Sequence, residues 1–180
     1  MSFNYDTYIS SFTWRYGSEP MRSIWSEQHK RRLMRRVWIA LATAQHEAGL
    51  VTAVQLADLQ SQADNIYIER ALTIEKETRH DVMAEIRTFA EPCPVGGGII
   101  HWGATSADIT DNVDVLRLRE AAVLLEEKLK KLLLVLADQI DTYADVVTMA
   151  HTHIQPAEPT SLGYRFAVYA QDLHEDLRAL

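Results

Sequence analysis

Three short polar clusters combine histidine with hydroxyl, carboxylate or basic side chains. The first is Thr78-Arg79-His80-Asp81, the second covers residues 101–112, and the third covers residues 151–160. Histidine gains and loses a proton near neutral pH, so it is suited to general acid–base catalysis. Hydroxyls and the free N–H groups at a helix start are suited to binding anions. Together these side chains favour acid–base chemistry on an anionic substrate.

The first cluster directly precedes an apolar stripe, residues 82–89, that predicts a helix. Thr78 would cap this helix, and Asp81 would lie near its positive end. Those roles leave Arg79 and His80 free to contact an anion. A purely structural helix start is an equal alternative for the cluster taken alone.

The second cluster predicts the start of a long helix. Thr105 or Ser106 would cap that helix, and the same helix start, beside the glycine loop of residues 96–98, is suited to binding a carboxylate. Three aspartates follow at positions 108, 111 and 114. Their spacing lacks the alternating ligands and the central glycine of a calcium loop, so we expect no metal there.

The third cluster contains two histidines, His151 and His153, one residue apart. A zinc site would need two more ligands, and the nearest candidates, His80, His101 and Glu158, have no motif spacing. Acid–base chemistry therefore fits better than metal binding, and a solvated loop is the structural alternative. The remaining histidines lie on amphipathic helices, and we expect ordinary surface or edge positions for His29, His46 and His174.

The elements that must position these clusters are predicted to be helices. Glycine and proline together make up only 12 of 180 residues, too few for the many turns of a β-sandwich or barrel. Residues 1–25 predict an irregular arm, with helices to follow at 26–48, 52–64, 65–75 and about 80–91. Residues 150–161 predict a polar loop. On the first long helix we expect most of the four arginines at positions 31, 32, 35 and 36 to be exposed to solvent.

The segment between Gly103 and Pro156 lacks glycine and proline and predicts one helix over about residues 106–146. Apolar residues recur along it at alternating steps of four and three from Leu118 to Tyr143, which is close to heptad spacing. Such a helix would be about 60 Å long, and it needs other long helices to bury its apolar face. A last helical pattern runs from Thr160 to Leu180 without a stop signal, so we expect the chain to continue in a longer protein.

Composition excludes several classes of protein. The apolar share of 47% is typical of a folded chain, and the net charge of −7 argues against general binding to nucleic acid or anionic membranes. Cys93 is the only cysteine, which leaves no intrachain disulfide. The N-terminus lacks the basic and apolar blocks of a signal peptide, and no apolar stretch approaches the ~20 residues that span a bilayer. A cytoplasmic location is the simplest expectation.

The clusters, in this order, resemble the motifs of the adenylosuccinate lyase family of the fumarase/aspartase superfamily. Arg15-Tyr16 with Ser18, Pro20 and Met21 is similar to the family's N-terminal substrate arm. Residues 79–84 are similar to its first histidine motif, residues 101–112 to its Gly-Ala-Thr-Ser loop, and residues 152–160 to its second histidine motif. The resemblance covers essentially the whole chain, and the Arg-His-Asp-Val motif favours this family over other superfamily lyases.

The resemblance implies an all-α fold, with a small helical domain over residues 1–110 and the first part of a long-helix bundle over 111–180. It implies cofactor-free β-elimination of fumarate from a succinylamino nucleotide, in a homotetramer whose active sites are shared between subunits. His153 would be the general acid, and His80 would lie close to it. Substrate contacts would come from Arg15, Tyr16, Arg79, Asp81, Thr105, Ser106, Thr152 and Gln155.

Two departures from the family pattern stand out. His151 replaces the usual arginine or aromatic residue before Thr-His, and nothing in this chain matches the mobile loop that supplies the family's serine base. We therefore expect the 180-residue chain to be inactive by itself. Two other interpretations stay open: another lyase of the superfamily, such as one similar to argininosuccinate lyase, and a non-catalytic module for helical assembly.

Overall fold

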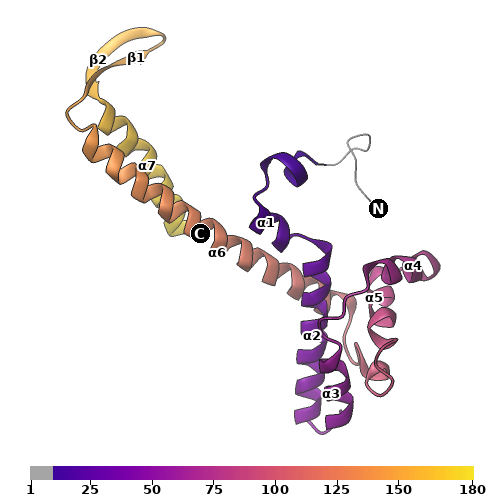
Figure 1. Cartoon of the computed structure of the whole chain (residues 1–180). Helices are drawn as coiled ribbons and strands as arrows, with labels where there is room; N and C mark the ends of the chain where they lie inside the picture. The colour runs from indigo at the N-terminus through magenta and orange to yellow at the C-terminus, as the bar shows by residue number, and fades with distance from the viewer. Residues whose placement is uncertain (1–9) are drawn as a thin grey trace. The chain divides into compact units, whose positions relative to one another are not determined.

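The structure is a computed structural model that describes residues 10–180, and it is built mainly of helices (Figure 1). The predicted all-α class is confirmed, with one small hairpin as the exception. The predicted features at residues 1–9 lie outside the described residues. The chain divides into two compact units, the first extending to Glu120 and the second covering Ala121–Leu180.

The first unit begins with the short π-helical turn η1 (Phe12–Tyr16) and helix α1 (Glu19–Ile24), in the segment predicted to be an irregular arm. Helix α2 (Glu27–Glu47) follows, with the Ser26 hydroxyl accepting a hydrogen bond from the His29 N–H and Gly49 in the left-handed region just beyond its end. Helix α3 (Ala53–Ser61) starts with a capping box formed by Thr52 and Gln55.

Helix α4 (Ile68–Thr78) begins three residues later than predicted, and α5 (Asp81–Ala90) packs against it. The predicted glycine loop contains one 3₁₀ turn, η2 (Gly97–Ile99). Asp58 of α3 holds this loop, because its carboxylate accepts the backbone N–H groups of Val95 and Gly96 at 2.8 and 2.7 Å. The loop leads to α6 (Ser106–Thr142), whose 37 residues make it about 55 Å long.

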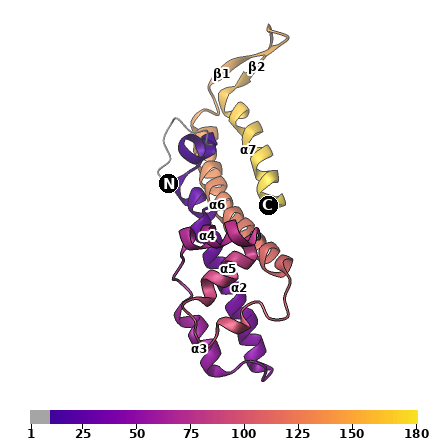
Figure 2. The same cartoon turned by 90° about the vertical axis from the view of Figure 1, so that its right-hand side faces the viewer.

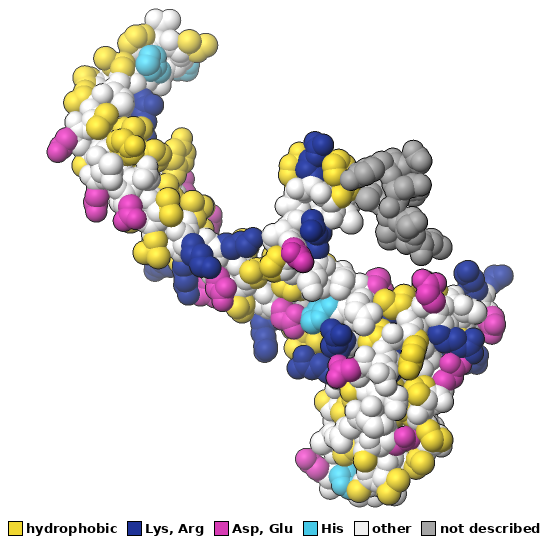
Figure 3. Space-filling view, viewed as in Figure 1, with side chains coloured by type: hydrophobic (Ala, Val, Ile, Leu, Met, Phe, Trp, Pro, Cys, Tyr) yellow, Lys and Arg dark blue, Asp and Glu magenta, His cyan; other side chains and the backbone are white. Residues whose placement is uncertain are grey.

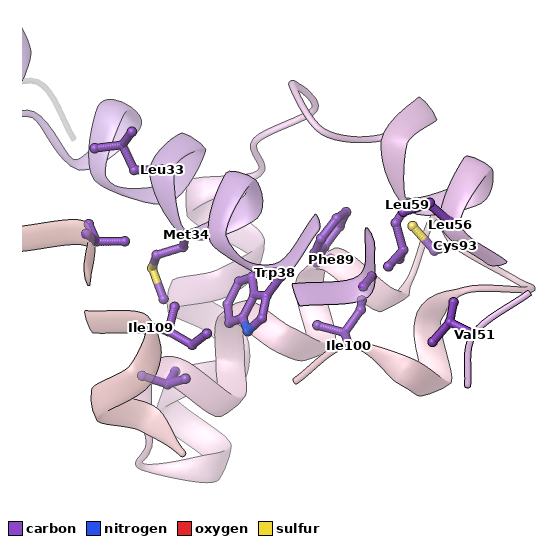
Figure 4. Close-up of a cluster of buried hydrophobic side chains, with 13 residues drawn as sticks. Leu33, Met34, Trp38, Val51, Leu56, Leu59, Phe89, Cys93, Ile100 and Ile109 are labelled. Carbon is purple, nitrogen blue, oxygen red and sulfur yellow. The ribbon is translucent and has the colours of Figure 1, made fainter. Parts of the chain in front are cut away.

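The hydrophobic core of the first unit is centred on α2 (Figure 4). The buried hydrophobic residues of this helix are Leu33, Met34, Trp38 and Ala42. These side chains pack with residues of α3, α5 and the first turns of α6. The other buried hydrophobic members are Val51, Leu56, Leu59, Val82, Phe89, Cys93, Ile100, Ile109 and Val113.

The expectation that most arginines of α2 are exposed is wrong for Arg31 and Arg35, which lie on the buried face one turn apart. Both contact the buried carboxylate of Glu85 on α5: Arg31 through Nη1, and Arg35 through Nη2 at 3.4 Å from Oε1. The Arg35 guanidinium also lies 4.0 Å from the centre of the Phe89 ring. The ion pairs and the ring compensate for burying the two positive charges and fix α5 on α2.

The second unit contains the last part of α6, the antiparallel strands β1 (Val147–Thr152) and β2 (Gln155–Ser161), and α7 (Leu162–Ala179). Helix α7 runs back alongside α6, and the hairpin extends beyond the ends of both helices (Figures 1 and 2). Gly163 makes the close approach possible, because a Cβ there would lie 2.6 Å from the Ile140 carbonyl oxygen. The rings of Tyr143 and Phe166 meet across the two helices, 6.1 Å apart.

The hairpin corrects the prediction of a polar loop over residues 150–161. Its two strands pair from Val147↔Ser161 to Thr152↔Gln155, with an irregularity between Met149 and His151. Pro156 and Pro159 cannot donate ladder hydrogen bonds, which argued against a strand, but a two-stranded hairpin has free edges that tolerate proline. Helix α6 also ends at Thr142 rather than near Val146, because β1 begins at Val147.

Candidate functional site

The first histidine motif forms the link between α4 and α5, and its capping differs from the prediction. Thr78 is the last residue of α4, and Arg79 ends that helix in the left-handed region with φ 53°. His80, not Thr78, caps α5: its Nδ1 accepts the Met83 backbone N–H at 3.3 Å. His80 is the residue just before α5 and stands three positions before Met83. Its ring nitrogen therefore reaches the Met83 N–H, the position that a capping hydroxyl would otherwise occupy. The Thr78 hydroxyl instead donates to the His80 carbonyl oxygen at 3.2 Å.

This capping bond sets the proton position on His80. A backbone N–H can only donate, so Nδ1 must be the acceptor, and the neutral ring carries its proton on Nε2. Asp81 lies next to the ring, with Oδ1 3.7 Å from Nδ1, and both side chains are more than half exposed. The motif therefore presents an imidazole N–H and a carboxylate to solvent at the start of a helix fixed by Glu85.

The second motif contains a histidine that sequence reasoning did not select as a site residue. His101 adopts the left-handed region with φ 67°, and its Nδ1 accepts the Trp38 indole N–H at 3.2 Å. Burial lowers the pKa of His101, Asp108 opposes this effect, and His80 adds a smaller lowering when it is protonated. Asp108 and His80 therefore both act electrostatically on the His101 ring. The available sequence signal was the position of His101 two residues before Gly103, the first residue of the Gly-Ala-Thr-Ser stretch.

The predicted helix start is present, but a carboxylate of the chain itself occupies part of it. Helix α6 begins at Ser106, and Asp108 Oδ2 accepts the backbone N–H of Thr105 at 2.8 Å. The Asn112 side-chain amide then donates to the Asp108 carbonyl oxygen at 2.7 Å. A substrate carboxylate at this helix start would have to use the other N–H groups of the first turn, or displace Asp108.

The second histidine motif lies at the tip of the hairpin in the second unit. His153 and Ile154 form its two-residue turn with φ values of 50° and 68°, and Thr152 pairs with Gln155 across it. Turns of this kind favour asparagine and glycine, whereas a β-branched residue with positive φ is a genuine outlier. His153, Thr152 and Gln155 are all exposed, and His151 lies opposite Pro156 in the hairpin.

The predicted substrate arm lies in η1. Arg15 and Tyr16 are both exposed, the Arg15 guanidinium lies 4.7 Å from the centre of the Trp14 ring, and the Tyr16 ring lies 6.4 Å from that of Phe12. The Arg22 side chain donates to the Gly17 carbonyl oxygen at 2.8 Å and so ties the arm to α1. The arm thus presents a cation and a phenol to solvent.

Backbone strain coincides with the three histidine motifs. Within residues 10–180, the non-glycine residues with positive φ are Arg79, His101, His153 and Ile154. Every one of them belongs to a motif singled out for its chemistry. Such conformations cost of order 1–3 kcal/mol each and gather at functional sites. Each of the three motifs is therefore a candidate functional site, the first two in the first unit and the third in the second unit.

Within residues 10–180, no helix is long and apolar enough to cross a membrane. Residues 10–180 also hold no group of three or more histidine, cysteine, aspartate or glutamate side chains placed to bind a metal ion.

Comparison with known proteins agrees with the resemblance seen in the motifs. A family described as "Lyase" matches residues 4–180. Adenylosuccinate lyase from Methanocaldococcus jannaschii is 40% identical over 175 residues, which are 96% of this chain and 38% of that protein. Adenylosuccinate lyase from Schistosoma mansoni is 38% identical over 177 residues, 98% of this chain and 37% of that protein.

The similarity extends to solved structures. The crystal structure of fumarate lyase from Mesorhizobium sp. BNC1 matches with a TM-score of 0.85 and 24% identity, over 96% of this chain and 40% of that chain. At this level of identity the match shows a shared fold. The chain spans somewhat more than a third of the length of the curated relatives that it matches. Because the family match covers nearly the whole sequence, this chain belongs to the Lyase family.

Proposed function

We propose that this chain is part of an adenylosuccinate lyase, a carbon–nitrogen lyase that releases fumarate from adenylosuccinate and from the related succinylamino-imidazole carboxamide ribotide of purine synthesis. The observation that carries the proposal is that the strained backbone of Arg79, His101, His153 and Ile154 falls within the motifs that resemble this family. The relatives named adenylosuccinate lyase, at 38–40% identity, support the choice of reaction.

In the proposed reaction a proton leaves the carbon next to a substrate carboxylate, and the C–N bond breaks at the neighbouring carbon. Negative charge builds up on that carboxylate in the transition state. Preorganised N–H and hydroxyl donors stabilise such charge best, and Thr105 and Ser106 at the start of α6 would supply them. His153 would protonate the departing nitrogen, and the base would come from outside this chain.

The other motif residues would bind the substrate. His80 would donate from Nε2, because Met83 engages its Nδ1. Arg79 and Arg15 would contact phosphate or carboxylate groups, with Tyr16 and Asp81 beside them, and Thr152 and Gln155 would flank the acid at the hairpin tip. The reaction needs no cofactor. A positive local site of this kind is compatible with the net charge of −7, because anion binding depends on nearby groups.

The proposal includes assembly into a homo-oligomer, with a tetramer as the expected form. It is supported by the second unit, in whose residues 121–180 only Gly163 is buried. Two helices and a hairpin without a core need other helices to cover their apolar side chains. A cytoplasmic location completes the proposal and is supported by the single cysteine, Cys93, which is buried as a free thiol.

The test is a fused enzyme in which this chain replaces the matching 175 residues of the Methanocaldococcus jannaschii enzyme. Fumarate release is measured from adenylosuccinate and from argininosuccinate, after sedimentation has shown that the fusion assembles. We expect turnover of adenylosuccinate and none of argininosuccinate. Cleavage of argininosuccinate alone would indicate a different lyase. A fusion that assembles but neither binds nor cleaves either substrate would favour the interpretation of the chain as a non-catalytic module for helical assembly.

A further inference from the structure

Trp38 connects the core of the first unit to the candidate site. Its side chain is only 1% exposed, and it lies at the middle of the buried cluster on α2 (Figure 4). Its ring packs against Phe89 of α5, with centroids 6.2 Å apart. It also meets the His101 ring edge-on, with centroids 6.3 Å apart and planes at 85°. The indole Nε1–H donates to His101 Nδ1 at 3.2 Å.

The indole bond determines which form of His101 is present. Indole nitrogen is a donor only, so His101 Nδ1 must be the acceptor, and the neutral imidazole carries its proton on Nε2. Protonating Nδ1 would set two donors against each other and would leave a buried indole N–H without its partner. The hydrogen bond from Trp38 therefore favours the neutral form of the His101 imidazole over its protonated form.

The backbone around His101 is fixed as well. The residue has φ 67°, and its carbonyl oxygen accepts the Ala104 N–H at 3.2 Å, while the next residue, Trp102, donates its N–H to Ile99 at 3.1 Å. The Trp102 carbonyl oxygen accepts the Gln45 side-chain amide at 2.7 Å. The His101 imidazole is thus held in place in three ways: by the hydrogen bond from Trp38, by the edge-on contact with its ring, and by the fixed backbone of the loop.

We propose that Trp38 is a positioning residue that holds His101 as a neutral imidazole whose Nε2–H donates to an anionic group of the substrate. The part concerning the substrate rests on the proposed function. The charged groups acting on His101 are Asp108 of α6, which favours its protonated form, and His80 of the α4–α5 link, which opposes it. The Asp108 carboxylate also accepts the Thr105 N–H at 2.8 Å.

The three histidines of the motifs differ in role. His101 and His80 both have Nδ1 engaged by a donor-only N–H, from Trp38 and Met83 respectively. Each can therefore offer an Nε2–H to an anion without changing its own charge. Proton transfer to the departing nitrogen is left to His153, which lies at an exposed hairpin turn. His101 is thus assigned to binding and not to acid catalysis.

The first measurement uses the 180-residue chain without substrate. Imidazole nitrogen NMR distinguishes the two neutral tautomers, and His101→Asn assigns the signal. We expect His101 to be neutral at pH 7, with its proton on Nε2 and Nδ1 acting as acceptor. A proton on Nδ1, or an even mixture of tautomers, would overturn the proposal.

The second measurement replaces Trp38 with benzothienylalanine, which keeps the size and shape of the ring but has sulfur in place of the N–H. Losing one neutral hydrogen bond should lower the ratio of the Nε2–H to the Nδ1–H tautomer by roughly 2- to 13-fold and raise the pKa of His101. The matched control is the same replacement at Trp25, which packs under Arg117 instead. It should leave His101 unchanged.

A tautomer ratio that stays the same in the Trp38 variant would overturn the positioning role. Trp38→Phe serves as a second variant, and circular dichroism confirms that each variant is folded. These measurements contain no substrate. A result that contradicts the role of Trp38 would therefore not change the outcome of the fumarate assay on the fused enzyme. Conversely, an inactive fusion would not alter the tautomer of His101.

Discussion

At the scale of single residues, the most demanding feature is the pair of arginines buried on α2. Arg35 is fully buried and Glu85 is 1% exposed, and burial lowers the pKa of Arg35 although Glu85 opposes the shift. Arg31, Arg35, Trp38 and Ala42 follow helical steps of four, three and four, so the sequence does contain the stripe that puts the arginines inside. This stripe alone does not predict burial, because charged side chains are rarely buried unless they are paired. The partner of Arg35 is Glu85, which lies 50 positions away in the sequence.

We expect Glu85→Gln to destabilise the first unit by roughly 3–5 kcal/mol, because it leaves the Arg35 guanidinium buried without a counter-charge. Urea unfolding measures the loss. The matched control is Glu91→Gln, which breaks the exposed pair between Arg70 and Glu91 and should leave stability almost unchanged. Equal effects of the two substitutions would show that the buried pair does not stabilise the packing of α5.

His101 predicts a dependence of stability on pH. Burial depresses its pKa in the folded state below the ordinary value of 6.5, so the unfolded chain binds its proton more readily. Its contribution is complete above about pH 6.5 and is lost as the pH falls through the folded pKa. We expect urea unfolding to show a smaller loss of stability between pH 7.5 and pH 5 in His101→Asn than in the wild type.

The control for this comparison is His174→Asn, since His174 is exposed on α7 and should leave the pH dependence as in the wild type. Asparagine is chosen at position 101 because it tolerates positive φ. An identical pH dependence in wild type and His101→Asn would contradict the depressed pKa.

At the scale of elements, the helices were largely predictable and the hairpin was not. The bounds of α2, α5 and α7 follow from apolar spacing, from the Ser26 cap and from the prolines after α5. The sequence did not predict the hairpin because its turn is His153-Ile154 instead of asparagine–glycine, and because β2 contains two prolines. For the candidate site, the residue types of the polar clusters point to His80, and His153 as the acid stays a prediction from the family resemblance. The indole hydrogen bond of Trp38 and the cap at His80 depend on contacts that only the folded chain reveals.

The packing of α7 on α6 gives a prediction at this scale. We expect Gly163→Ala to destabilise the second unit by about 1–3 kcal/mol or more, because the added Cβ would meet the Ile140 oxygen and the Ala144 backbone within 3 Å. Amide hydrogen exchange in α7 measures the effect. Gly98→Ala is the control, since nothing lies within 4 Å of its Cβ position. Unchanged protection in Gly163→Ala would mean that the two helices do not pack as described.

At the scale of the whole molecule, the two units differ in how much they bury. The buried hydrophobic residues of the described chain all lie between Leu33 and Val113, within the first unit. In the second unit apolar side chains lie open on α6 and α7 (Figure 3). The exposed ones include Leu125, Leu132, Leu134, Val135, Val168 and Tyr169. The near-heptad spacing from Leu118 to Tyr143 predicted this need for other helices.

We therefore expect the chain to self-associate at micromolar concentration, because monomers rarely tolerate apolar patches above roughly 300–600 Å². Sedimentation velocity measures the size of the particle. Leu125→Glu together with Leu132→Glu should shift it toward the monomer, whereas Lys128→Gln on the same helix should not. A folded wild-type monomer at these concentrations would contradict the expectation.

The central claim is that His153 acts as the general acid of an adenylosuccinate-cleaving site, and one rate constant tests it most directly. In the fused enzyme, kcat for fumarate release from adenylosuccinate is compared between wild type and His153→Asn, with asparagine retaining the preference for a positive-φ turn. The control is His151→Gln, which removes the other imidazole of the hairpin. We predict that His153→Asn lowers kcat by about 10²–10⁴-fold with little change in substrate binding, while His151→Gln stays within a few-fold of wild type. A kcat of His153→Asn within a few-fold of wild type would contradict the account.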